Sequence, residues 1–318
     1  MKKFLFTILM LIITCSLFGN EWKFTTSAVL QLSPVNQPSP SISADENHLA
    51  PMTEINIPIP FGQFIAQYVI PLNFGDSPVF QNANISLVAG PALTPITLDT
   101  QFGVTFTPSP LCNIGLAATA GTGWTLLGHD GLAQYDASVN TYKPLNTFTD
   151  WKYSFITQVN FQFDFGILFP GDWTHIVTTA NYIVSYEAST AANQHESWLW
   201  AGKEDVNGFQ HAGNVMLGYM MPFKFKLIGL TAGWKGHFHG DDFGNYNISY
   251  DGSFVEISLG LHSIIEFSEK SKLIIAAVVP SRRGFIEESN ITDAFISKTK
   301  AGREWFFNGI TIQWLYSF

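Results

Sequence analysis

Apolar and polar residues alternate along much of this 318-residue chain, and a period of two restricts what the chain can fold into. In ITLDTQFGVTF, residues 96–106, the even positions are almost all apolar. The odd positions hold Thr97, Asp99, Gln101, Gly103 and Thr105. Because successive side chains of a β-strand point to opposite faces, this segment predicts a strand with one apolar and one polar face.

The same alternation recurs in many segments, which together predict an all-β fold. YSFITQVNFQFDF repeats it, with a polar face of Ser154, Gln158, Asn160, Gln162 and Asp164. The predicted strands are residues 22–32, 63–70, 82–89, 96–106, 153–165, 175–187, 209–221, 225–238, 254–267, 273–279 and 306–318. Pro58, Pro60 and Pro71 interrupt the region of the second strand, where residues 53–60 alternatively fold inward as part of a loop.

The links between these segments alternate in length. Short links with turn-forming residues, each preceded and followed by strand, are 107–110, 170–172, 221–224 and 268–271. Long polar links are 33–51, 125–150, 188–207, 240–251 and 281–304. This layout is typical of an antiparallel transmembrane β-barrel with short periplasmic turns and long extracellular loops. An even count near twelve strands is expected, and ten or fourteen also fit.

The N-terminus has the pattern of a secretory signal. Lys2 and Lys3 precede an apolar run that is too short to cross a bilayer as a helix. We therefore expect residues 1–19 to be a cleaved signal peptide and residues 20–318 to form one domain. Cys15 also fits a relaxed lipoprotein box, which is the alternative. If the signal is removed beyond Cys15, Cys112 is the single cysteine left, so no internal disulfide can form.

Composition limits the class of exported protein. Charged residues make up only 13% of the chain, aromatic residues 15%, and the formal net charge is −9. Without a basic stripe, a nucleic acid is not expected as a partner. A secreted β-sandwich and an outer-membrane β-barrel both remain. In hydrocarbon each unpaired backbone amide costs several kcal/mol, so a spanning sheet must close on itself, with apolar side chains outside.

The C-terminal segment, ITIQWLYSF, distinguishes these two classes. It ends on Phe318, and Ile310, Ile312, Trp314 and Tyr316 occupy alternate positions before it. This pattern resembles the C-terminal assembly signal of bacterial outer-membrane β-barrel proteins. The resemblance implies a barrel in the bacterial outer membrane, surrounded by outer-membrane lipid, whose last strand is recognised by the barrel assembly machinery.

Aromatic residues are placed where two girdles at the membrane interfaces require them. Those near the predicted periplasmic strand ends are Trp22, Phe169, Trp173, Phe223, Phe267, Tyr316 and Phe318. Those near the predicted outer ends are Trp124, Trp151, Tyr153, Tyr186 and Trp234.

Strand parity indicates which polar side chains face the interior. The predicted lumen-lining residues are Asp99, Gln101, Gln158, Asn160, Gln162, Asp164, Lys235, Glu256 and His262. A polar interior favours a narrow pore or specific channel for uptake of a small-molecule solute, since lumen charges tune selectivity. The alternative is a side-chain network that fills a narrow barrel and stabilises it.

HFHGDDFGN, residues 237–245, is the stretch richest in reactive side chains. His237 and His239 share one face, and Asp241 and Asp242 follow in an expected extracellular loop. Such groups bind divalent metals or perform acid–base chemistry, and carboxylate–histidine pairs at an extracellular rim resemble those of the omptin proteases. No other omptin motif is present, and an ordinary solvated loop is the simpler interpretation.

The sequence contains no further motif for a reaction. It has neither the serine motif of outer-membrane phospholipase nor a phosphate loop, a cysteine zinc spacing or a dinucleotide fingerprint. We therefore predict no cofactor and no metal. An enzyme or adhesin acting through its extracellular loops, or a purely structural membrane protein, is the alternative to the channel.

Overall fold

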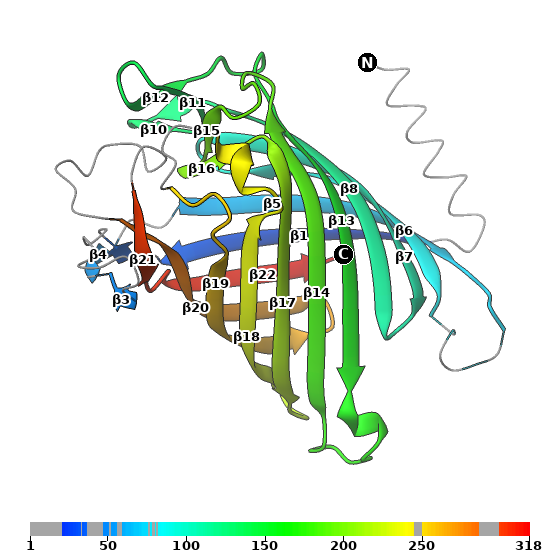
Figure 1. Cartoon of the computed structure of the whole chain (residues 1–318). Coiled ribbons are helices and arrows are strands. Elements are labelled where there is room, and N and C mark those ends of the chain that lie inside the picture. The colour runs from blue at the N-terminus through cyan, green and yellow to red at the C-terminus, as the bar shows by residue number, and fades with distance from the viewer. Residues whose placement is uncertain are drawn as a thin grey trace, which may run out of the picture.

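The computed structural model describes residues 21–32, 34–36, 47–50, 52–55, 59–75, 77, 80, 82–244, 250–285 and 299–318. Twelve long antiparallel strands form a closed β-barrel (Figure 1), which confirms the predicted fold class. The ring closes because β1 pairs with both β5 and β22, while β20 pairs with both β19 and β22. The expected signal peptide, residues 1–19, lies outside the described residues.

The long strands of the ring together form the barrel wall. In ring order they are β1 (Glu21–Leu32), β5 (Ile59–Pro71), β6 (Asn84–Leu93), β7 (Thr97–Ser109), β8 (Cys112–Gly123), β13 (Lys152–Asp164), β14 (Ile176–Ser189), β17 (Gly208–Met220), β18 (Phe225–His237), β19 (Glu256–Ser268), β20 (Ser271–Phe285) and β22 (Ile310–Ser317). β8 is absent from the predicted strands, although the predicted links on either side of it, residues 107–110 and 125–150, require a strand between them. Among the helices of the described residues, none has the length and apolar character needed to cross a membrane.

The outside of the barrel is apolar, as the alternation predicts. Phe102, Phe155 and Leu230 are exposed there by 65%, 60% and 66%. Since neighbouring side chains of a strand point to opposite faces, the polar residues between them point inward. Every strand of the ring has a partner on both sides, so the wall has no open edge.

The two ends of the barrel differ, and we call them the turn end and the loop end. At the turn end, β7 joins β8 through residues 110–111 and β19 joins β20 through residues 269–270. Three links depart from the predicted rhythm. Residues 72–83 form a long link at the turn end, and residues 94–96 form a short link at the loop end. The turn-end link predicted as residues 170–172 extends over residues 165–175 and contains a short 3-10 helix, Phe165–Ile167.

β5 and β6 both extend beyond their predicted ranges. Pro60 and Pro71 lie at the two ends of β5, where a missing backbone donor is tolerated. β6 continues past Gly90 because glycine permits a close approach there. A Cβ at Gly90 would stand 1.9 Å from the Phe64 carbonyl oxygen of β5.

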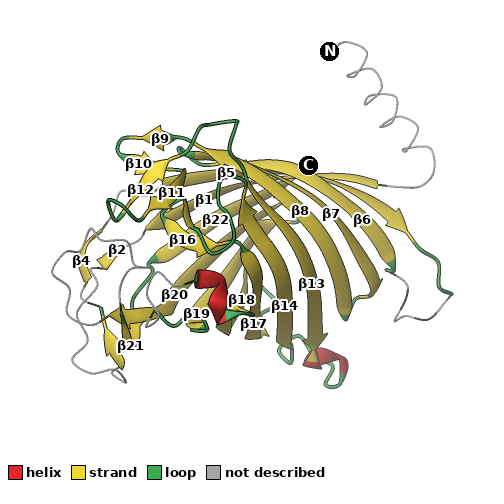
Figure 2. Ribbon diagram, turned by 45° about the horizontal axis from the view of Figure 1, so that its top comes forward, coloured by secondary structure: helices red, strands yellow, loops and turns green. Residues whose placement is uncertain are grey.

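Shorter strands lie at the loop end of the barrel (Figure 2). β11 (Leu132–Asp136), β12 (Thr141–Pro144), β15 (Ser197–Trp200) and β16 (Lys203–Val206) form a four-stranded sheet, which we call the loop sheet. β9 (Thr125–Leu126) pairs with β10 (His129–Asp130), β2 (Pro34–Asn36) with β4 (Met52–Ile55), and β3 (Asn47–Leu49) with β21 (Lys300–Trp305). Residues 56–58, within the segment that alternatively folds inward, lie outside the described residues.

Candidate functional site

The loop sheet lies against the inner face of the barrel wall. The Trp200 ring comes within 2.7 Å of where a Cβ would stand at Gly121 of β8, so glycine leaves room for the indole. The Lys152 ammonium of β13 lies 5.7 Å from the centre of the Trp200 ring. Leu132 and Trp198 are each 1% exposed and form a small apolar core with their neighbours. The loop sheet is therefore a packed structure that narrows the loop end.

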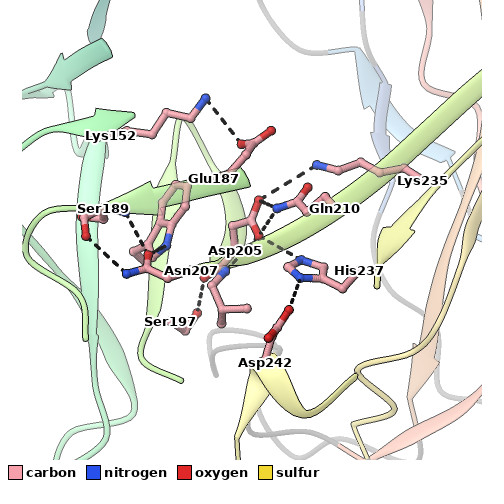
Figure 3. Close-up of polar contacts among 12 residues, drawn as sticks. Lys152, Glu187, Ser189, Ser197, Asp205, Asn207, Gln210, Lys235, His237 and Asp242 are labelled. Carbon is pink, nitrogen blue, oxygen red and sulfur yellow. Dashed lines mark hydrogen bonds and ion pairs between the residues drawn. The ribbon is translucent and has the colours of Figure 1, made fainter. Parts of the chain in front are cut away.

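Asn207 attaches the link between β14 and β17, which contains β15 and β16, to the barrel wall (Figure 3). Its side-chain oxygen accepts hydrogen bonds from the Trp198 indole at 3.0 Å and the Ser189 backbone at 2.9 Å. Its amide donates to the Ala192 carbonyl at 2.8 Å. One carboxamide thus holds the end of β14, the link that follows and β15 in a single arrangement.

Asp205 of β16 joins the loop sheet to two wall strands (Figure 3). Its carboxylate accepts hydrogen bonds from the Gln210 amide at 2.8 and 3.0 Å and lies 3.2 Å from His237 Nε2. The Lys235 ammonium is 4.0 Å away. Burial raises the pKa of Asp205, but the hydrogen bond with His237 and the positive charge of Lys235 outweigh it, so the pKa lies below its usual range.

His237 lies between two carboxylates. Its Nδ1 is 3.4 Å from Asp242 Oδ2, and its Nε2 faces Asp205. We call Asp205, Gln210, Lys235, His237 and Asp242 the Asp205 junction. Because both ring nitrogens of His237 face carboxylates, no serine, threonine or cysteine of the described residues is hydrogen-bonded to it. The arrangement links the loop sheet, the wall and the link after β18.

The structure separates the other two residues of the predicted reactive stretch. His239 precedes the short 3-10 helix Gly240–Phe243, is exposed and makes no side-chain cap. Asp241 is also exposed. Across the described ranges, no three His, Cys, Asp or Glu side chains are grouped so as to hold a metal ion.

A cavity of about 460 Å³ lies between the loop sheet and the wall. Its lining combines aromatic rings with charges of both signs: Trp198, Trp200, Phe243, Tyr250, Phe254, Lys203, Lys235, Glu256, Arg282 and Arg283. The Arg283 guanidinium lies 4.2 Å from the Tyr250 ring centre and donates to the Tyr250 hydroxyl at 3.2 Å. Burial raises the pKa of that hydroxyl, so it remains protonated. We call this space the mouth cavity.

The residues predicted to line the lumen lie at different heights on the inner face. Lys235 and Glu256 are register partners at the loop end and line the mouth cavity. Asp164 lies at the turn end, where its carboxylate is 2.6 Å from His175. The remaining members are spread over β7, β13 and β19 between the two ends: Asp99, Gln101, Gln158, Asn160, Gln162 and His262.

The sequence alone does not predict the roles of several residues in these arrangements. Asp205 and Trp198 lie in a long polar link that has the composition of an ordinary loop. Gln210 has the inward parity of its strand, but nothing in the sequence indicates that Asp205 contacts it. Only the packing of the loop sheet against the wall brings the two together.

Comparison with known proteins shows only distant similarity. No protein-family model matches the chain, and no curated protein matches it. Similar solved structures include an outer membrane channel from Pseudomonas putida F1 (10% identity, TM-score 0.44, 93% of this chain and 95% of that chain). Others are the β domain of a Bordetella autotransporter (9%, 0.42, 93% and 98%) and the KdgM porin (7%, 0.36, 93% and 99%). This similarity is too distant to carry a functional assignment.

Proposed function

We propose that the chain is a β-barrel of the bacterial outer membrane that forms a narrow channel for small polar molecules. The observation that carries this proposal is the division of the closed barrel into an apolar outer face and a polar inner face with cavities. An apolar exterior suits hydrocarbon, because the closed ring leaves no backbone group unpaired at an edge. Rings of twelve strands are intermediate between side-chain-filled small barrels and open porins.

The same proposal assigns the two ends of the barrel. The turn end faces the periplasm and the loop end faces outward, as in other outer-membrane barrels. Exposed aromatic side chains at the turn end, including Phe169, Trp173, Phe223 and Phe318, suit the headgroup level. A solute then enters through the mouth cavity, whose aromatic and charged lining is the first selective contact.

Recording in planar lipid bilayers tests the channel. The purified protein must first show heat-modifiable gel migration, which reports a folded barrel. We then expect discrete and small conductance steps, because the loop sheet narrows the opening. Deleting residues 132–144, which removes two strands of the loop sheet, should enlarge the steps. A folded barrel that inserts into the bilayer without any conductance would contradict the proposal.

A further inference from the structure

Four asparagines form a row across the inner wall of the barrel. Asn113 of β8, Asn160 of β13, Asn181 of β14 and Asn214 of β17 lie on four neighbouring strands. They are in register: Asn160 is the partner of both Asn113 and Asn181, and Asn181 is the partner of Asn214. We call them the asparagine row. At a strand spacing of about 4.8 Å, the row is about 14 Å long.

The carboxamides of the row are hydrogen-bonded in one direction. Asn181 donates to Asn160 at 2.5 Å, and Asn160 donates to Asn113 at 2.7 Å. Each carboxamide has two N–H donors and an oxygen that accepts two bonds. The two bonds therefore leave N–H donors and oxygen lone pairs of the row available to a molecule beside it. These bonds also fix the orientation of the amides before such a molecule arrives.

The row faces open space. A cavity of about 350 Å³ is lined by all four asparagines together with Gln162 and Thr179. None of these side chains is ionisable. On β13 and β14 the charged side chains lie at the strand ends, Lys152 and Glu187 near the loop end and Asp164 near the turn end. This part of the wall thus offers many hydrogen bonds and no charge.

We propose that the asparagine row is a binding site for uncharged polyhydroxylated molecules, namely sugars and polyols. The inference rests on the proposed channel and names its solute class. A hydroxyl group both donates and accepts, and so does a carboxamide, so the two match without a charge on either side. A wall without charge gives no attraction to an ion of either sign, whereas rings of charge select ions. In-register amides present a series of equivalent sites along which hydroxyl groups can exchange partners.

The binding test uses maltose as the uncharged probe and gluconate as the charged one. Calorimetry on the folded protein in detergent should detect maltose binding and no gluconate binding. Asn160→Ala and Asn214→Ala should each weaken maltose binding by about five- to tenfold, the effect of one lost hydrogen bond. Gln67→Ala is the matched control, because it removes a carboxamide from the inner face of β5, outside the row. It should change binding less than twofold.

Bilayer recording on the same variants separates this site from the channel itself. Maltose should block the current through the unmodified channel in a saturable manner, and Asn160→Ala should reduce the block. Asn160→Asp adds a negative charge to the row and should shift ion selectivity towards cations. Maltose binding without conductance would refute the channel and leave the site standing. Conductance without maltose binding, or binding that Asn160→Ala and Asn214→Ala leave unchanged, would refute the site alone.

Discussion

Placing an arginine at the centre of the outer face tests the orientation of the wall. Phe102 is 65% exposed on the outside of β7, and its neighbour Gln101 points inward. A strand tilted by about 40° rises about 2.5 Å along the barrel axis per residue. Phe102 is then about 13 Å from the level of Thr97 and about 18 Å from that of Ser109. It therefore lies near the middle of the apolar band.

The expected cost of Phe102→Arg is large. An arginine on the lipid face at the bilayer midplane destabilises a barrel by about 2–4 kcal/mol. Loss of the phenyl ring from hydrocarbon adds roughly 1–2 kcal/mol, since full burial of such a side chain contributes about 1.5–3 kcal/mol. The sum, about 3–6 kcal/mol, corresponds to more than a hundredfold change in the ratio of folded to unfolded protein.

Gln101→Arg is the matched control, because the same charge then enters the lumen one residue away. Folding of both variants into phospholipid vesicles is followed across a urea series by heat-modifiable gel migration. We expect Phe102→Arg to lower the urea midpoint strongly and Gln101→Arg to leave it near that of the unmodified chain. Equal midpoints, or a larger loss for Gln101→Arg, would refute the assignment of the two faces.

Four further predictions concern the ends of the barrel. His237→Ala leaves Asp205 and Asp242 without their shared partner, so proteolysis within residues 190–207 should accelerate while heat-modifiable migration is unchanged. Because the folded-state pKa of Asp205 is lowered, its stabilising contribution is present above the ordinary aspartate pKa and is lost as the pH falls through the folded value. The same proteolysis in the unmodified chain should therefore accelerate only below about pH 4. Cys112, near the turn end, should resist an impermeant maleimide in intact cells, whereas Ala137→Cys, introduced together with Cys112→Ser, should react. If residues 310–318 act as the assembly signal that their pattern resembles, deleting Phe318 should reduce assembly in cells more than folding into vesicles, where the cellular machinery is absent.

The period of two predicts the barrel because the two environments of its wall are chemically opposite. Segments such as residues 96–106 and 153–165 show an apolar and a polar face without any information about the neighbouring strands. Strand ends are predicted less well. β6 continues through Gly90 and Pro91, because the close approach of the Phe64 carbonyl oxygen leaves room only for a glycine at that position of the strand. Residues 94–96 make a short loop-end link that the rule of alternating lengths does not anticipate.

The candidate sites depend on register, and register is not encoded in the alternation. Parity places Asn160 inward, but only pairing with β8 and β14 aligns it with Asn113 and Asn181. A shift of two residues would preserve every apolar and polar face and break the row. The Asp205 junction is even harder to predict from the sequence, because Asp205 reaches the wall only through the fold of a long polar link.

The inner surface also contains a short apolar strip, which agrees with a saccharide as solute. β8 to β17 carry the asparagine row, whereas the inward positions in the middle of β20 are Ile274, Ala276 and Val278, as their partners Gln313, His262 and Gly260 show. In the twelve-strand ring β20 lies across from β8. Sugars present hydroxyl groups at their edges and C–H groups on their faces. The asparagine row and the short apolar strip of β20 together offer partners for both surfaces, which a uniformly charged lumen cannot do.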